Sequence, residues 1–507
     1  MTWTVEILDK ANGKYLFAPE NCLPVLLEWD DRLGCGKALI ACQQSSLSLN
    51  DWRVFLGQDL RVYDESGRLA WWGYLERVEH RQGGASYMLD LAELANRVAV
   101  QYLDSGLADN WSFQQSAWRT EALSQESFGI RDKLLRRRFL TPPIADRLAD
   151  NYLREHAFPQ KRLLRSGEQG EDGDGFVLTC RSWAQSLEWR LWEGWNGVLE
   201  HRPSQHGVQA LGLDAACLRL GQSFLVKESL EAFSLAVRIR KEGNPADSLR
   251  LSLRADDNNK PSGVSLASRS LSASEISEEN YAWLELELEP KVYLNAGQRY
   301  WLVVERTGAS DPANGFWLGM DENLGFYGGG VLLHNGAAWT QRVPNADLLF
   351  RFVGRNELRK QIESLVDFGG QFLVGIDTSQ VEMVSLPVFL TQGQNCLKSL
   401  YDLLEQGNAG IQPLCLSVSP GRRLEIRPQK MAKDAIYYLE PNGKIVNRFG
   451  GVLVAPWQAV GEWLRSPNGN SVYISKLSLH PLTGGVNLNE TISVESALSI
   501  FANTIYL

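Results

Sequence analysis

Apolar and polar residues alternate through the middle of the chain, and this alternation predicts strands. Five runs repeat with period two between about residues 209 and 352, and loops rich in Gly, Asn, Pro and Asp separate them. Such alternation is typical of half-buried antiparallel strands. The five runs are residues 222–226, 235–240, 249–254, 282–288 and 299–305. We therefore predict a β-sandwich for this stretch.

The first hundred residues carry the same pattern in shorter runs. Residues 2–8 alternate, residues 61–78 contain two runs joined by a turn, and residues 87–91 form a further run. Short strands with a turn signal about every ten residues are typical of small barrels. The N-terminal part is therefore expected to be a small β-barrel.

A helical pattern occurs twice, each time ahead of a similar pentapeptide. Leu-Glu-His-Arg-Pro stands at 199–203, and Leu-Glu-Ile-Arg-Pro stands at 424–428. The helix expected before the first pentapeptide covers residues 182–194, and the helix before the second covers 396–407; both end in Gly. Further upstream a helix and a strand are expected in each copy, at 144–158 and 176–179 in the first and at 357–368 and 388–390 in the second. The repeated order indicates a duplication; ordinary α/β sequence with a coincidental Arg-Pro is the alternative.

Together these patterns predict a multidomain β-rich α+β protein. Its length of 507 residues suffices for three or four domains at roughly 150 residues each. The predicted parts are an N-terminal β-barrel (1–105), a first α/β unit (106–208), an inserted antiparallel β-sandwich (209–355), a second α/β unit (356–430) and a C-terminal β-rich segment (431–507).

Composition narrows the classes of function. Charged residues make up 22% and hydrophobic ones 44%, which is ordinary globular usage. A net charge of −9 argues against general nucleic-acid binding, because neutralising phosphates requires concentrated Lys and Arg. The basic cluster at residues 131–138 alternates with Leu134 and Leu135 and is expected to be a solvated helix face.

Cysteine usage and the N-terminus suggest a compartment. The seven cysteines are scattered without metal-type spacing, and their odd number predicts reduced thiols and assembly in a cytoplasm. Residues 1–6 lack the basic and apolar regions of a signal peptide, and no apolar run approaches 18 residues. Neither an N-terminal export signal nor a transmembrane segment is expected.

Two regions resemble phage tail and baseplate hub proteins. Residues 57–63, 70–78 (Ala-Trp-Trp-Gly-Tyr-Leu-Glu-Arg-Val) and 91–97 resemble the opening of that family, and residues 435–492 are similar to its late barrel. The resemblance implies a homotrimer whose duplicated modules form a pseudo-sixfold ring that docks on the tail tube. It implies tube, distal tail, spike or fibre proteins as partners, and a place in the virion tail after assembly in the host cytoplasm.

The predicted sandwich resembles jelly-roll modules that occur as carbohydrate-binding-like appendages on bacterial surface and phage proteins. The landmarks are Gln-Ser-Phe at 222–224, residues 295–301, residues 327–330, Trp339 and residues 347–352, in that order. This second resemblance implies a peripheral contact domain, with a host-surface glycan as one partner.

Three aromatic residues in or beside loops are the candidate carbohydrate site: Trp317, Tyr327 and Trp339. A sugar ring has one apolar CH face, which a flat aromatic ring covers. Packing under a loop or at a subunit contact is the alternative for all three. By contrast, Trp283 and Trp301 lie inside alternating runs and are expected in the core.

Catalytic motifs are missing from the sequence. The six histidines lack zinc-site spacing, and neither a Gly-x-Ser-x-Gly elbow nor a phosphate-binding Gly-rich loop occurs. A glycosidase carboxylate pair stays open, because its members need not be close in sequence. The acidic loops at 171–175 and 256–259 are expected to be solvated turns rather than Ca²⁺ sites. We therefore expect a structural protein with no catalytic residues, no metal and no cofactor. A glycan-binding or glycan-degrading protein acting through the sandwich is the alternative.

Overall fold

The computed structural model divides the chain into two compact units. Unit 1 comprises Met1–Glu193, Ile362–Glu382 and Gly393–Leu507, and unit 2 comprises Gly194–Gln361 and Met383–Gln392. The structure describes residues 3–491 and 505–506, apart from 32, 44–46, 84, 105–112, 166–173, 196, 202–204, 323–329, 343–345, 389, 409–412, 430–436, 440–444, 448–457, 459, 461, 466–470 and 481–484. Strands dominate both units, which confirms the predicted β-rich class. Among these residues no helix has the length and apolar content needed to cross a membrane.

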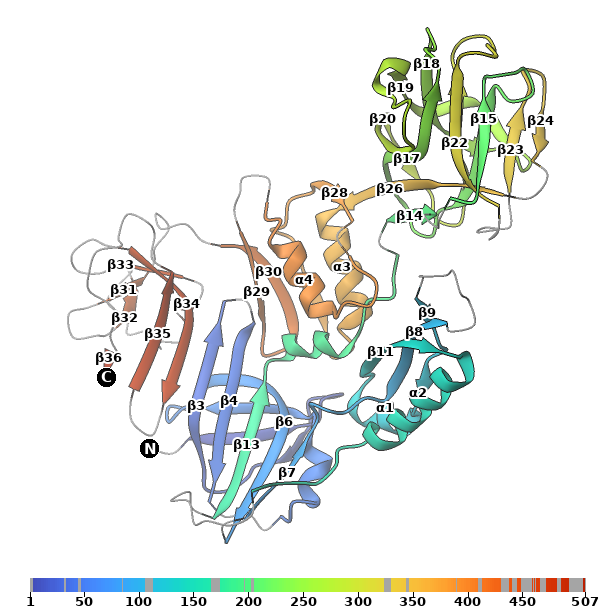
Figure 1. Ribbon diagram of the computed structural model, residues 1–507. Coiled ribbons are helices and arrows are strands. Elements are labelled where there is room, and N and C mark those ends of the chain that lie inside the picture. Colours follow the sequence, from blue (N-terminus) through green and yellow to red (C-terminus); the bar gives the residue numbers. More distant parts are fainter. Residues whose placement is uncertain are drawn as a thin grey trace. The chain divides into compact units, whose positions relative to one another are not determined.

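Unit 1 combines a large N-terminal sheet, a small α/β layer and the C-terminal strands (Figure 1). The elements of the N-terminal sheet and the helices beside it are β1 (Thr4–Leu8), β2 (Tyr15–Phe17), β3 (Cys22–Asp30), β4 (Gly34–Cys42), η1 (Asp51–Phe55), β5 (Asp59–Tyr63), β6 (Leu69–Gln82), β7 (Ala85–Asp90), β12 (Arg162–Arg165), β13 (Gly175–Arg181) and η2 (Trp183–Trp189). The α/β layer contains β8 (Arg97–Asp104), β9 (Gln114–Gln115), β10 (Arg119–Thr120), α1 (Ala122–Phe128), β11 (Asp132–Leu140) and α2 (Pro142–His156). The remaining elements are α3 (Leu358–Gly369, which begins in unit 2), β27 (Gly375–Asp377), α4 (Cys396–Leu404), β29 (Leu414–Val418), β30 (Arg423–Pro428), β31 (Tyr437–Leu439), β32 (Ile445–Asn447), β33 (Trp463–Arg465), β34 (Ser471–His480), β35 (Gly485–Thr491) and β36 (Ile505–Tyr506).

The N-terminal sheet is open, so the predicted small barrel is wrong. Its strand order runs β2-β1-β5-β6-β13-β4-β3 and continues into the C-terminal strand β34, and this path has two ends in the described part of the chain. β13, about a hundred residues later in sequence, lies between β4 and β6 and pairs antiparallel with both (Figure 1). Gly73 permits this close pairing, because a Cβ there would lie 2.1 Å from the Arg181 carbonyl oxygen. A barrel built from the first hundred residues alone would have to close by pairing its own strands. Here β13 and β34, which are distant in sequence, pair with those strands instead.

A disulfide joins the first two long strands of this sheet. Cys22 in β3 and Cys42 in β4 are directly opposite each other in the antiparallel pair, and their sulfur atoms are bonded. The prediction that all thiols are reduced is therefore wrong for this pair. The other five cysteines are free and buried: Cys35, Cys180, Cys217, Cys396 and Cys415.

The basic cluster, predicted to be a helix, lies on a strand of the α/β layer. Residues 132–140 form strand β11, which pairs in parallel with β8, and not a helix. The amphipathic helix α2 follows, close to the predicted residues 144–158, and packs Ala145 and Ala149 onto Val98 and Val100 of β8. Parallel pairing with β8, which is distant in sequence, determines the extended conformation of β11, and Arg131 just before it is buried.

The two predicted repeats fold differently at their ends. The helix expected at 182–194 is the shorter 3₁₀ helix η2, whereas those expected at 357–368 and 396–407 correspond to α3 and α4. The first pentapeptide begins in β14 (Val198–His201) of unit 2, which pairs with β26. The second lies in β30, which pairs with β27 and β29 of unit 1, and the strand expected at 388–390 lies three residues earlier, as β28 (Ser385–Pro387). The two copies therefore differ in their strand partners.

Unit 2 consists of antiparallel strands around one large apolar core. One sheet contains β14, β15 (Gly207–Leu211), β17 (Leu230–Glu242), β20 (Ala282–Leu294), β22 (Gly315–Asp321), β25 (Asp347–Leu348), β26 (Phe350–Glu357) and β28, and the other contains β16 (Arg219–Leu225), β18 (Ser248–Asp256), β19 (Pro261–Ser272), β21 (Arg299–Arg306), β23 (Val331–His334) and β24 (Trp339–Gln341), with the 3₁₀ helix η3 (Ala273–Glu275) following β19. The two sheets are continuous where β19 pairs with β20, Ser268 opposite Glu289. All five strands predicted from period-two alternation are present. Leu235 of the first sheet and Leu251 of the second are both fully buried in the shared core.

Candidate functional site

Trp317 lies on a half-exposed surface of unit 2 with two charged neighbours. It is in strand β22, beside β17, and its indole Nε1 donates a hydrogen bond to Glu242 Oε2. The Arg240 guanidinium lies 5.9 Å from the Trp317 ring centroid and 5.5 Å from that of Tyr281. Arg240 also pairs with Glu242, at 3.7 Å. Two aromatic rings, one cation and one carboxylate thus form a cluster, here called the Trp317 cluster. Tyr281 was missed from the sequence, because it lies in a polar loop without an alternating pattern.

Trp339 has a different environment. It begins β24 and contacts the His334 ring edge-on, with centroids 4.9 Å apart. A Cβ built on Gly221 of β16 would lie 3.3 Å from the Trp339 ring, so the indole packs closely over that strand. Burial is the largest of the effects that lower the pKa of His334 from its ordinary value. These contacts suit a packing residue.

The structure does not group the three predicted aromatics. Trp317 lies in β22, which pairs with β15, β17 and β25, whereas Trp339 lies in β24, which pairs with β23, and Tyr327 lies outside the described residues. The expectation for the strand tryptophans is confirmed for Trp301, which is 1% exposed, and wrong for Trp283, which is 36% exposed. In β20 the leucines at 284, 286 and 288 face inward, so Trp283 shares the outward parity with Glu285 and Glu287. That parity could be read from the sequence.

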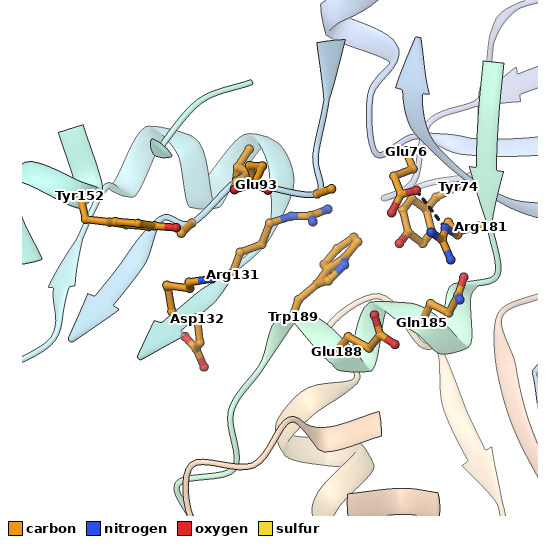
Figure 2. Close-up of a pocket in the computed structure, with 14 residues that line it drawn as sticks. Tyr74, Glu76, Glu93, Arg131, Asp132, Tyr152, Arg181, Gln185, Glu188 and Trp189 are labelled. Atoms are coloured by element: carbon orange, nitrogen blue, oxygen red, sulfur yellow. Dashed lines mark hydrogen bonds and ion pairs between the residues drawn. The ribbon is translucent and has the colours of Figure 1, made fainter. Parts of the chain in front are cut away.

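A polar pocket in unit 1 is the second candidate site. It has a volume of about 300 Å³ and lies where β6, the end of β13, η2 and the start of β11 meet (Figure 2). Its wall is dominated by charged and aromatic side chains, among them Tyr74, Glu76, Glu93, Arg131, Arg181, Gln185, Glu188 and Trp189. We call it the Arg131 pocket.

Two of the acidic groups beside this pocket are held by cations. Glu76 accepts a hydrogen bond from Arg181 Nε at 2.9 Å, as the dashed line in Figure 2 marks. The Asp132 side chain is fully buried and pairs with both Arg97 and Arg190, at 3.0 Å each. The backbone N–H of Leu191 also donates to Asp132, at 2.9 Å. This bond lies just after η2 ends, where Arg190 is already in an extended conformation.

The Glu188 carboxyl differs from these. Burial is the largest cause that raises its pKa, the neighbouring Glu76 charge adds to the rise, and Arg181 opposes it. Although Glu188 is an exposed residue, its carboxyl at the pocket is therefore harder to ionise than a free glutamate.

Arg131 reaches the pocket because a local network holds the backbone before β11. Gly129, with φ of 75°, ends α1, and its carbonyl accepts a hydrogen bond from the Asn96 side-chain amide at 2.7 Å. The same Asn96 accepts from the Arg131 backbone N–H at 2.8 Å. The Arg131 guanidinium then lies 3.5 Å from the Trp189 ring centroid. The sequence reveals Arg131 only as one member of a basic cluster, because its partners come from distant elements.

Metal and thiol chemistry have little support in the described part of the chain. No group of three or more His, Cys, Asp or Glu side chains there is arranged to hold a metal ion. Burial raises the pKa of the Cys217 and Cys396 thiols to about 12. Because the thiolate is the reactive form, neither thiol is set up as a nucleophile at neutral pH.

Comparisons with known proteins identify no family. No family model and no curated protein matches the chain. Among solved structures, the cysteine protease and lectin-like domains of Cwp84, a surface layer associated protein of Clostridium difficile, align at 8% identity over 63% of each chain, with a TM-score of 0.23. The Cry4Aa toxin of Bacillus thuringiensis aligns at 7% identity over 63% of this chain and 57% of its own, with a TM-score of 0.17. The VP2 subviral particle of infectious bursal disease virus aligns at 10% identity over 69% and 77%, with a TM-score of 0.14. Likenesses this weak assign neither a fold family nor an activity.

Proposed function

We propose that this chain is a non-enzymatic hub subunit of a phage tail tip, baseplate or related contractile apparatus. In this proposal unit 1 is the ring-forming scaffold that closes or extends the tail tube, as part of a homotrimer, and the sandwich of unit 2 is a peripheral jelly roll. Its partners are tube, distal tail, spike or fibre proteins of the virion tail. The proposal rests on the sequence resemblance and on the way unit 2 is inserted.

The insertion is the observation that carries the proposal. Unit 1 is assembled from stretches before and after unit 2, and its first and last parts share a sheet through the pairing of β3 with β34. The first strand of unit 2, β14, and the much later strand β26 are themselves an antiparallel pair, with Val198 opposite Val353. An insert whose ends are adjacent adds little loop-closure cost to its host. This arrangement suits an appended contact module on a scaffold.

Oligomeric state tests the proposal directly. Purified full-length protein is passed through gel filtration with light scattering over a concentration series, and a trimer is expected. A monomer at every concentration would contradict the hub assignment. The same preparation is incubated with host envelope fractions, where no sustained release of reducing sugar or peptide is expected. Sustained turnover that is lost when one carboxylate is replaced would instead show that the protein is an enzyme.

A glycan contact at unit 2 is a second candidate function, favoured by the Trp317 cluster. Flat aromatic faces beside charged hydrogen-bonding groups are the chemistry that binds sugars, and single shallow sites gain strength when an oligomer presents several. The variants Trp317→Ala and Tyr281→Ala are expected to keep the parent melting temperature and to lose binding to a host-glycan array. Trp339→Ala is the comparison, since its ring packs on Gly221. Equal array binding by all variants and the parent would remove the glycan function.

A further inference from the structure

Arg131 is a buried cation with unused hydrogen-bonding capacity. Its side chain lines the Arg131 pocket and belongs to a residue that is 5% exposed. Among the described residues, Nη1 donates to the Leu91 carbonyl oxygen at 3.1 Å, whereas Nε and Nη2 are buried and have no hydrogen-bond partner there. Buried donors left unpaired cost stability, and charged ones cost more. A side chain of this kind requires an acceptor, and the described part of the chain does not provide one.

The two unused atoms form one edge of the guanidinium. Nε–H and one N–H of Nη2 point the same way, and this parallel pair matches the two oxygens of a carboxylate. The face of the guanidinium is already covered by the Trp189 ring, 3.5 Å away. Figure 2 shows the side chain extending past Trp189 toward Tyr74 and Glu76. This edge is therefore the part of Arg131 whose donors still lack an acceptor.

Surrounding charges restrict the ligand class. Glu76 pairs with Arg181, and Asp132 pairs with Arg97 and Arg190, so neither carboxylate forms an ion pair with Arg131. Glu93 and Glu188 add negative charge to the wall. A dianionic phosphate would meet repulsion from these acids, whereas a single carboxylate carries half that charge and fits the planar edge.

The ionisation of Arg131 agrees with this geometry. Burial, partly offset by Tyr74 and Glu76, lowers its pKa to about 10. The group is therefore still cationic at neutral pH, and its charge is destabilised by the site. An incoming anion would relieve that cost.

We propose that the Arg131 pocket is a carboxylate-binding site in which Nε and Nη2 of Arg131 hold both oxygens of one carboxylate group. At about 300 Å³ the cavity admits a small acid or one acidic side chain. The carboxylate comes from a free small acid or from a Glu or Asp side chain of a partner protein. This inference does not depend on the hub assignment, because the site lies within one chain.

Titration calorimetry on the full-length protein tests the site. The probes are sodium acetate and the blocked residue acetyl-glutamyl-amide, each at constant ionic strength with chloride as the background anion. Saturable binding of at least one probe is expected; tighter binding of acetate indicates a free acid, and tighter binding of the blocked glutamate indicates a protein side chain. Absence of saturable binding for both, or tighter binding of inorganic phosphate than of either, would overturn the proposal.

Variants assign the binding to the edge of Arg131. Arg131→Lys keeps the charge but removes the paired donors, and it is expected to weaken binding at least tenfold. Arg68→Met is the matched control, because Arg68 is an exposed cation paired with Asp64 outside the pocket wall, and it should bind as the parent does. If Arg131→Lys fails to fold, Glu188→Gln takes its place: loss of the nearby acid should tighten binding severalfold. Unchanged affinity in Arg131→Lys, or in Glu188→Gln when it is the substitute, would contradict the assignment.

Discussion

The backbone N–H of Gly354 donates a hydrogen bond to the Gly197 carbonyl oxygen, with N and O 2.8 Å apart. These two glycines flank the paired ends of β14 and β26, so the long insert begins and ends at one point. Removing residues 198–353 and joining Gly197 to Gly354 through a two- or three-residue Gly/Ser linker should therefore leave unit 1 folded. Trp195 belongs to the apolar core of unit 2 and is replaced by Ser in the same variant. Gel filtration with light scattering should give the stoichiometry of the full chain.

A shorter deletion provides the control for this experiment. Removing only residues 209–352 leaves β14 without three of its four partners, and it exposes Leu199, which is 4% exposed in the intact chain. An unpaired apolar edge strand promotes aggregation, so this variant should be the less soluble of the two. If the longer deletion also yields only aggregates, unit 2 is not a separable module.

Trp301 should be essential to the stability of unit 2. Its ring is 1% exposed, it lies on the central strand β21, and its Nε1 donates to Asp256 at 2.7 Å. Trp301→Ala should lower the free energy of unfolding by about 3–5 kcal/mol, because it leaves a large cavity. Trp283→Ala, at an exposed position, should cost about 1 kcal/mol or less. Urea unfolding followed by circular dichroism compares them, and similar losses would show that burial does not separate the two.

Lys10 should make stability rise with pH in the alkaline range. Burial first, and the nearby Arg131 charge second, lower its pKa to about 8 from an ordinary value of 10.5, with Asp9 opposing. Between these values the unfolded chain binds the proton more strongly than the folded one, so folding is favoured as pH increases. From pH 7 to pH 10 the parent should gain about 2–3 kcal/mol relative to Lys10→Met.

The comparison cancels other alkaline titrations, such as those of the buried cysteines, because they are common to both proteins. Lys14→Met, at an exposed position four residues further along the chain, is the charge-matched control and should show no such pH-dependent gain. The difference in unfolding free energy between the parent and Lys10→Met is measured at each pH. If this difference stays constant, the lowered pKa of the buried Lys10 is contradicted.

The Cys22–Cys42 disulfide should add measurable stability to unit 1. It closes a loop of 20 residues, for which loop-closure entropy predicts about 3 kcal/mol. Peptide mapping without reductant should recover the linked pair, and dithiothreitol should lower the urea midpoint of the parent. The double variant Cys22→Ala/Cys42→Ala should have a midpoint that reductant does not change. Recovery of both cysteines as free thiols in untreated protein would contradict the bond.

Local patterns in the sequence suffice for most single elements. The period-two runs correspond to β16, β17, β18, β20 and β21, and the helical patterns near residues 144, 357 and 396 correspond to α2, α3 and α4. Each of these depends on which side chains share a face of one helix or strand, and the spacing of residues along the chain determines that. The inward parity of Leu284, Leu286 and Leu288, which leaves Trp283 exposed, belongs to the same class of information.

Pairing between distant segments decided the rest. β13 lies between β4 and β6, so the first hundred residues form part of an open sheet instead of the predicted barrel. The basic segment pairs with β8 and is therefore a strand instead of the predicted helix. Alignment of β3 with β4 brought Cys22 opposite Cys42. Arg131 acquired its place over Trp189 only because Asn96 and Gly129 hold the chain before β11. Such contacts form when surfaces that are far apart in sequence bury one another, so the local spacing of residues cannot predict them. The Arg131 pocket was therefore found only in the tertiary structure.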